Sequence, residues 1–372
     1  MSAPSRLALS AALAVAACAF VPTAAPAAAP SPSFSVIARN LDNPRGLAAG
    51  ADGAIYVAEA GRAGKICDKK RENCSGATAG VSRLSGGKAK RVVSGLPSFA
   101  AEGGLFATGT HGVAIGADGT RYMANAGTLL CASRKPIAKA LRPFVGHVSI
   151  AKASSKVSKP GADLQAYECK RDPDKTDKNS NPYAILALPN GHQYVVDAGA
   201  NAVLDVKGKT IKVVATIPSR KVEDGLQQPV PTSITKGPDG AFYVGTLDEA
   251  AGNGNARVWR IVPGKKPTVY RDGFTGVTGL AFDKAGNLYV TEFTTDWNEE
   301  NAPSGAVAFV SADGTERKQL GQGTFFYPTG ALIQDDVLYV SNWSTMPGVA
   351  AAAGPFKGLT GQVVKTSPLG VS

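Results

Sequence analysis

The chain has 372 residues, of which 44% are hydrophobic and 19% are charged. This composition excludes a disordered chain and supplies enough apolar side chains for a large core. Forty Lys and Arg against 29 Asp and Glu give a net charge of +11. The basic residues are scattered, with no basic helix and no pattern of stacking aromatic residues. We therefore expect a solvated cationic surface and no nucleic-acid partner.

Residues 1–29 have the pattern of a secretory signal peptide. A weakly positive start at residues 1–6 precedes an apolar run over 7–21 that is short for a membrane span, and small residues with proline follow. We expect cleavage within residues 27–29. The run VAAC, which ends at Cys18, also resembles a lipoprotein box, so lipid anchoring outside the cytoplasm is the alternative to secretion. We expect no transmembrane segment in either case.

Four cysteines remain after residue 29, and four cysteines allow three pairings. Cys67 and Cys74 share one polar loop, so we expect them to pair, which leaves Cys131 to pair with Cys169. Metal binding is the rival interpretation, but a CxxC spacing and a nearby histidine are both missing. The sequence therefore predicts two structural disulfides, in agreement with export.

One pattern recurs six times along the chain: a short apolar strand, a turn of the Asp-Gly type, and a second strand that contains a tyrosine and ends in a polar residue. The repeats are residues 41–61, 110–127, 182–199, 231–248, 277–294 and 328–344. A third and a fourth strand follow, for example residues 80–85 and 90–96 in the first repeat. Four-stranded units repeated at roughly 45 to 70 residues are typical of an all-β, six-bladed β-propeller.

The first strand of the chain is expected to close the last blade. Residues 33–40 form a lone strand ahead of the first repeat, whereas residues 361–367 end the last repeat with no strand after them. Pairing the two would remove the open sheet edges at both termini. We therefore expect a single propeller domain over residues 33–368, and a monomer.

The spacing between repeats is uneven because extra residues fall mostly between the second and third strands. These insertions are residues 62–79, 128–145, 249–255, 296–304 and 344–358, and another polar stretch, 163–181, leads into the third blade. Loops after second strands emerge at one rim of a propeller. Insertions gathered on one rim either build a binding site or reflect tolerated drift in loop length, and we leave both readings open.

Two sets of polar residues mark this same rim. The ends of the second strands carry Glu59, Asn125, Asp197, Thr246, Glu292 and Asn342. The starts of the first strands carry Arg45, His111, Tyr183, Thr232, Thr278 and Thr329. Because the two strands are antiparallel and joined by a tight turn, we expect both sets to ring one mouth of the central channel.

Carboxylates and amides around one axis suit a hard cation such as Ca²⁺. We predict a divalent-cation site, Ca²⁺ or another ion, formed by Glu59, Asn125, Asp197, Glu292 and Asn342. His111 is the candidate general base and Glu292 a second catalytic candidate. The predicted ligand contacts are Arg45, Tyr183, Thr232, Thr278 and Thr329. The alternative is that these side chains only form hydrogen bonds from blade to blade and cap the channel with water.

Other motifs are weak. His192 lies in a turn at the opposite rim, and GxSxG, HExxH and P-loop motifs are missing. Residues 172–180, DPDKTDKNS, faintly resemble a calcium-binding loop, but the sixth position is Asp177 where such a loop has glycine. We therefore do not predict a calcium loop there.

The stretches NPRGLAAGADGAIYVAEAG, HQYVVDAGANAVLDV and PTSITKGPDGAFYVGTL resemble the ScyD/ScyE family, secreted relatives of NHL-repeat propellers. The likeness covers nearly all of the mature chain, and it implies a six-bladed fold and export without assigning a reaction. The repeats are also similar to those of virginiamycin B lyase and of gluconolactonase-type propellers, which hold a divalent metal at the channel mouth. The histidine-rich mouth of the lyase is not reproduced, because only His111 lies in the ring.

Two hypotheses follow for function. The first is a non-catalytic secreted scaffold that binds an extracellular protein, glycan or small molecule on the loop-rich rim. The second is a metal-dependent hydrolase of the lactonase type, or a lyase, centred on Glu59, Asp197, Glu292 and His111. An enzyme needs a pocket open to substrate, whereas a scaffold needs only the rim.

Overall fold

The computed structural model describes residues 32–223, 225–249, 252–298, 304–352, 356–367 and 369. They belong to one compact unit, Pro32–Ser372. The expected signal segment, with Cys18, lies outside the described residues. Within the described part of the chain, no helix has the length and apolar character needed to cross a membrane.

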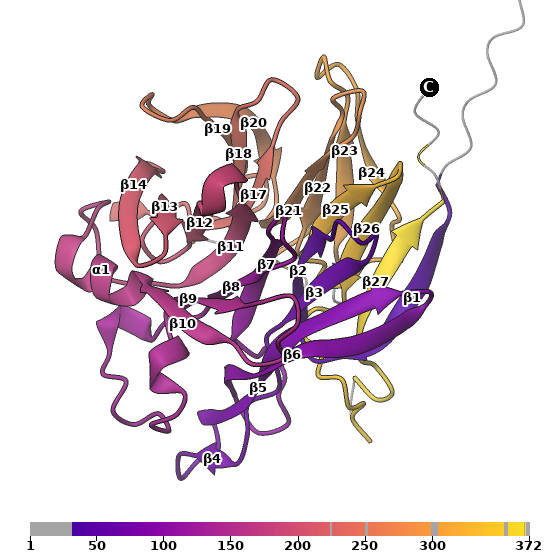
Figure 1. The fold of residues 1–372 in the computed structure, drawn as a ribbon. Coiled ribbons are helices and arrows are strands. Elements are labelled where there is room, and N and C mark those ends of the chain that lie inside the picture. The colour runs from indigo at the N-terminus through magenta and orange to yellow at the C-terminus, as the bar shows by residue number, and fades with distance from the viewer. Residues whose placement is uncertain are drawn as a thin grey trace, which may run out of the picture. The chain divides into compact units, whose positions relative to one another are not determined.

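Six antiparallel sheets form the six-bladed β-propeller that the sequence predicted (Figure 1). In blade 1 the strands are β2 (Pro44–Ala49), β3 (Ile55–Glu59), β5 (Cys74–Ser85) and β6 (Lys88–Ala100), with the short β4 (Ile66–Cys67) also paired to β5. In blade 2 they are β7 (Thr110–Ile115), β8 (Arg121–Asn125), β9 (His147–Ala151) and β10 (Lys159–Asp163). In blade 3 they are β11 (Pro182–Ala187), β12 (Gln193–Asp197), β13 (Ala202–Lys207) and β14 (Thr210–Thr216).

The remaining blades follow the same plan. Blade 4 comprises β17 (Pro231–Lys236), β18 (Phe242–Thr246), β19 (Ala256–Ile261) and β20 (Thr268–Phe274), preceded by the hairpin β15 (Arg220–Val222) and β16 (Gly225–Gln227). Blade 5 comprises β21 (Val277–Phe282), β22 (Leu288–Glu292), β23 (Ala306–Val310) and β24 (Arg317–Leu320). Blade 6 comprises β25 (Ala331–Gln334), β26 (Val337–Asn342), β27 (Gly361–Thr366) and β1 (Phe34–Leu41).

Strand β1 closes the ring, as expected from the sequence. It pairs antiparallel with β27, with Phe34 opposite Thr366 and Leu41 opposite Gly361. The last blade is therefore built from both ends of the propeller, and unfolding either end opens the whole ring. Pairing also removes two sheet edges that would otherwise be open to other chains.

One element differs from the sequence-based expectation. The polar stretch before blade 3 contains the helix α1 (Leu164–Arg171). The side chain of Asp163 accepts a hydrogen bond from the backbone N–H of Ala166 and caps the first turn, and Lys170 with Arg171 complements the negative end of the helix. Two 3₁₀ turns, Leu129–Cys131 and Arg142–Phe144, lie in the long loop of blade 2.

The first strands of the six blades stand innermost and contact one another in a closed ring, from β2 through β7, β11, β17, β21 and β25 back to β2. Small residues make this approach possible. A Cβ atom on Gly46 would lie 3.0 Å from the carbonyl oxygen of His111, and one on Gly112 would lie 2.9 Å from that of Tyr183. A Cβ on Gly330 would meet the carbonyl oxygen of Arg45 at 2.5 Å.

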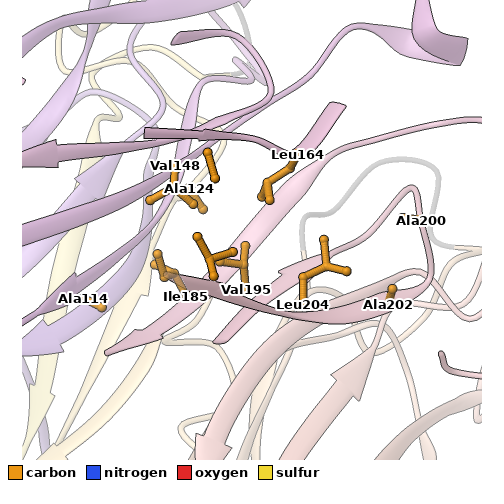
Figure 2. Close-up of a cluster of buried hydrophobic side chains, with 11 residues drawn as sticks. Ala114, Ala124, Val148, Leu164, Ile185, Val195, Ala200, Ala202 and Leu204 are labelled. Atoms are coloured by element: carbon orange, nitrogen blue, oxygen red, sulfur yellow. The ribbon is translucent and has the colours of Figure 1, made fainter. Parts of the chain in front are cut away.

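Apolar side chains fill the space between neighbouring blades. Figure 2 shows the cluster between blades 2 and 3, to which Ala124 and Val148 contribute from one side and Val195 and Leu204 from the other. Leu164, the first residue of α1, is fully buried in the same cluster. The helix is thus anchored by its apolar first turn to the packing that joins two blades.

Both predicted disulfides are confirmed. Cys67 pairs with Cys74 within the first long loop, and Cys131 pairs with Cys169. The second bridge ties α1 to the 3₁₀ turn in the long loop of blade 2. The two bridges are compatible with an extracellular protein.

We predict that Gly330→Ala destabilises the fold by about 1–3 kcal/mol, because the new methyl group would press on backbone atoms of blade 1 that cannot rotate away. Denaturant unfolding measures the loss. Gly116→Ala is the matched control, since the nearest atoms to its Cβ belong to the side chains of Asp118 and Tyr122, at 3.0 and 3.2 Å. Equal losses in the two variants would contradict the steric explanation.

Candidate functional site at the loop-rich rim

Five of the six residues that begin the first strands lie together at the channel axis. A cavity of about 60 Å³ lies there, and its lining includes His111, Tyr183, Thr232, Thr278 and Thr329. The rings of His111 and Tyr183 lie 4.7 Å apart, centroid to centroid. A cavity of this size has room for only a few water molecules.

The three threonines of this ring are bound to neighbouring blades. The hydroxyl of Thr278 donates to the carbonyl oxygen of Pro328 at 2.8 Å, and that of Thr329 donates to Pro44 at 3.2 Å. Thr232 donates in the same way to Val277. Each accepting carbonyl belongs to the residue just before the equivalent position in the next blade. The threonines therefore fasten blade to blade, which was the alternative to a ligand role.

Arg45 is a buried cation at the same mouth. Its guanidinium donates to the carbonyl oxygens of Ser344 and, at 2.8 Å, of Ala107, so it links the loops of blades 6 and 2 across blade 1. Burial lowers the pKa of Arg45. It forms no ion pair with a carboxylate among the residues that the structure describes.

His111 is neutral at ordinary pH. Burial, and then the charge of Arg45, lower its pKa from 6.5 to about 3. Its Nε2 accepts a hydrogen bond from the backbone N–H of Gly109 at 3.3 Å. A base with so low a pKa is poorly matched to proton abstraction near neutral pH. The predicted role of His111 as a general base therefore gains no support from its surroundings, and it stays a prediction.

The other two histidines lie away from this mouth. His147 is buried, and its Nδ1 lies 2.9 Å from the carbonyl oxygen of Val145, which suits a structural role. His192 pairs with Asp205, with 2.8 Å between Nδ1 and the carboxylate, beside Lys207 and Lys212.

The polar residues that end the second strands are all buried, and they form hydrogen bonds inside their own blades. Glu59 accepts from the backbone N–H of Asp42 and from Arg91, each at 2.7 Å. Asp197 accepts from the hydroxyl of Ser180 and the backbone N–H of Asn181, each at 2.6 Å.

Glu292, Asn125, Asn342 and Thr246 repeat this arrangement. Glu292 accepts from the backbone N–H of Thr275 at 2.8 Å, and Asn342 accepts from that of Phe326 at 2.7 Å. Asn125 lies 2.9 Å from Thr110, and Thr246 bonds to the backbone of Arg257.

None of these six residues contributes to the described lining of the axial cavity. Burial raises the pKa of Glu59 and of Glu292, against the opposing charges of Arg91 and Arg317. The predicted cation site at this ring stays a prediction, with most of its oxygens already hydrogen-bonded.

A row of aromatic side chains crosses the same rim, and sequence reasoning did not find it. Phe106 contacts Tyr327 at 5.8 Å, Tyr327 contacts Phe293 at 4.9 Å, and Phe293 stacks on Trp297 at 6.1 Å, all between ring centroids. Phe106 is 51% exposed. We call these four residues the aromatic row. They come from three different loops, so no single stretch of sequence reveals them.

Two members of the aromatic row hold unusual backbone conformations. Phe106 has φ of 51° and Tyr327 has φ of 47°. Bulky residues rarely adopt this left-handed region, and holding them there costs roughly 1–3 kcal/mol each. The backbone N–H of Phe106 donates to the carbonyl oxygen of Thr345 at 2.9 Å, which fixes this loop against blade 6. Such strain collects at sites where a side chain must be held in one position.

A second feature that the sequence did not indicate is an acidic cluster beside α1. One carboxylate oxygen from each of Glu168, Asp172 and Asp174 lies within 4.8 Å of the others. Glu168 is fully buried, and neither of its carboxylate oxygens has a hydrogen-bond partner among the described residues. Burial, and then the charges of Asp197, Asp174 and Asp172, raise the pKa of Glu168 to about 8.

Comparisons with known proteins support the fold and go no further. No protein-family model matches the sequence, and no curated protein matches it either. Among solved structures, a gluconolactonase from Xanthomonas campestris has a TM-score of 0.53 at 11% identity, with 90% of this chain and 89% of that chain covered. A luciferin-regenerating enzyme has a TM-score of 0.50 at 12% identity, over 92% and 97% of the two chains.

A streptogramin B lyase is also similar, with a TM-score of 0.49 at 14% identity over 91% of this chain and 98% of that chain. That score is too low to argue from. Identities this low show a shared fold and leave the activity open.

We predict that His111 makes the protein lose stability as the pH falls. The unfolded chain binds a proton at His111 below about pH 6.5, whereas the folded chain does so only near pH 3. The contribution of neutral His111 to the free energy of unfolding is therefore complete above pH 6.5 and declines below it. Between pH 7 and pH 5 the wild type should lose about 2 kcal/mol more than His111→Gln. Urea unfolding at both pH values measures this difference, and equal losses in the two proteins would show that His111 titrates normally.

Proposed function

We propose that this protein is an extracellular binding protein that takes its ligand on the loop-rich rim, at the aromatic row. The observation that carries the proposal is the continuous contact of Phe106, Tyr327, Phe293 and Trp297 across that rim. Phe106 is exposed and the other three side chains are half-buried, and aromatic faces held in fixed positions offer apolar contact area at a low entropy cost. Export is supported by the signal-like segment over residues 1–29 and by the two disulfides.

A glycan of the cell envelope is the ligand class that we favour. Sugar rings present flat apolar faces that pack on aromatic side chains, and the net charge of +11 favours an anionic polymer. The resemblance to the ScyD/ScyE family supports export and a propeller scaffold, and that family membership is part of the proposal. A protein partner is the other outcome that a binding experiment can reveal.

The channel mouth favours binding over turnover. The axial cavity of about 60 Å³ is smaller than a lactone needs, and the ring threonines are engaged between blades. Small-molecule sites are usually several times larger. The metal-dependent hydrolase or lyase hypothesis therefore has less support than the binding hypothesis, and it can be tested separately.

We predict that Phe106→Ala combined with Trp297→Ala weakens binding to purified envelope polysaccharide by at least about tenfold, because two aromatic contacts are lost. Tryptophan fluorescence titration measures binding by the wild type and by Phe106→Ala alone. Isothermal calorimetry measures binding by the double variant, because that variant lacks Trp297. Val157→Ala is the matched control, since Val157 is 74% exposed in the turn between β9 and β10, at the opposite rim. Unchanged binding in the double variant would remove the aromatic row from the proposal.

We further predict that the wild type does not hydrolyse lactones or cyclic esters with added Ca²⁺ or Mg²⁺, and that Glu292→Gln keeps the wild-type affinity for polysaccharide. Glu292 bonds to Thr275 within blade 5, so its loss should affect stability and leave ligand binding unchanged. A colorimetric lactonase assay and calorimetry provide the two readouts. Turnover in the wild type that disappears in Glu292→Gln would establish the hydrolase hypothesis.

A further inference from the structure

We propose that Glu168, Asp172 and Asp174 form a Ca²⁺ site at the junction of blades 2 and 3. The three carboxylates come from the end of α1 and the loop after it, and one oxygen from each lies within 4.8 Å of the others. None of these three residues belongs to the predicted ring at the channel mouth, although Asp197 of that ring is a near neighbour of Glu168, and the proposal does not depend on the proposed binding function.

The state of Glu168 is the observation that points to a ligand. Its side chain is fully buried, yet neither carboxylate oxygen has a partner in hydrogen-bond geometry in the described part of the chain; the backbone N–H of Asn179 lies near enough to offset part of the rise in its pKa. Asp172 also has one buried carboxylate oxygen without a partner. A buried carboxylate normally has such partners, because leaving it without them costs several kcal/mol. A cation between the three side chains would supply the missing interaction.

The surroundings add negative potential, and the ammonium of Lys175 in the same loop donates to the carbonyl oxygen of Arg171 at 2.9 Å. The site lies at the C-terminal end of α1, where the helix dipole is negative. Asp197 lies close enough to Glu168 to raise its pKa further. None of the three carboxylates takes part in an ion pair among the described residues, and the nearby Lys170 and Arg171 are exposed. The acidic side chains and the negative end of α1 therefore favour a cation at this point.

The chemistry favours Ca²⁺ over Mg²⁺. Ca²⁺ accepts six to eight oxygens in irregular arrangements, and three carboxylates binding through one or both oxygens can supply three to six, with water completing the shell. Mg²⁺ demands a nearly ideal octahedron, which three carboxylates from a helix end and a loop have no reason to provide. An exported protein meets Ca²⁺ at concentrations that suit a weak extracellular site, with a Kd on the order of 10⁻⁴–10⁻³ M.

The position of the site gives the ion a structural role. Asp174 accepts a hydrogen bond from Asn201 at 2.8 Å, and Asn201 also donates to Gln228, which precedes blade 4. Cys169, beside Glu168, is tied by its disulfide to Cys131 in the long loop of blade 2. Bound Ca²⁺ would therefore hold together loops that lead into three blades.

Equilibrium dialysis with radioactive Ca²⁺ on the whole mature protein tests the proposal. We expect one ion per chain, and at least about a tenfold loss of Ca²⁺ affinity in Glu168→Gln. We also expect the melting temperature to rise with added Ca²⁺, and to rise less with added Mg²⁺. Glu168→Gln should fold at least as well as wild type without Ca²⁺, because the uncharged amide removes repulsion. Asp172→Asn serves as the second variant if Glu168→Gln does not fold.

Two control variants locate the ion. Asp313→Asn removes an aspartate that is bonded to Ser311 and Thr315 in a turn of blade 5, and it should leave Ca²⁺ binding unchanged. Glu292→Gln should also leave it unchanged. Two results would overturn the proposal. One is the absence of bound Ca²⁺ at about 10 mM, a concentration well above the expected Kd. The other is a Ca²⁺ affinity in Glu168→Gln equal to that of the wild type. Loss of binding in Glu292→Gln alone would place the ion at the channel mouth instead.

Discussion

The close approach of the six innermost strands is the constraint on which the rest of this structure depends. At three of the six junctions, Gly46, Gly112 and Gly330 let the backbones of neighbouring first strands approach so closely that a Cβ atom there would meet the next strand at 2.5 to 3.0 Å. Threonine hydroxyls bond to carbonyl groups across the junctions of blades 4 and 5, 5 and 6, and 6 and 1. This packing leaves a cavity of about 60 Å³ at the axis, so the channel itself has little room for a ligand.

The rim combines a repeated backbone with variable side chains. After the polar end of each second strand, the next residue donates its N–H to a carbonyl group about 17 positions earlier, as Ala60 does to Asn43 and Phe293 does to Gly276. This bond does not depend on the side chain. Blades 1 to 3 place alanine there, whereas blades 4 to 6 place Leu247, Phe293 and Trp343. One face of the rim has therefore become apolar and aromatic without any change in the fold.

Much of this architecture was predictable because it depends on patterns that repeat. The tyrosine repeat, the closure of blade 6 by β1 and the pairing of Cys67 with Cys74 each follow from short-range or periodic signals. The partners of Glu59 were not predictable, because Asp42 and Arg91 reach it from opposite ends of blade 1. The same holds for the aromatic row, whose members meet only when loops from three blades converge.

The acidic cluster was missed for a different reason. Residues 172–180 resemble one known type of calcium loop only faintly, because its sixth position is glycine and this chain has Asp177 there. In the structure the buried member of the cluster is Glu168, which precedes that stretch and lies on α1, an element that the sequence had not suggested. A motif defined by spacing in a loop cannot include a ligand that a helix supplies.

Two buried glutamates in this chain show how surroundings decide the role of a carboxylate. Glu59 receives hydrogen bonds from the Asp42 amide, Ser82 and Arg91, so its burial is compensated within blade 1. Glu168 is buried as deeply, yet it has acidic neighbours and no hydrogen-bond partner among the described residues. At neutral pH such a group must take up a proton or a cation. Two further carboxylates lie at the same point, and a proton on Glu168 would leave their charges unopposed, whereas one divalent cation could contact all three carboxylates and offset two of their three negative charges.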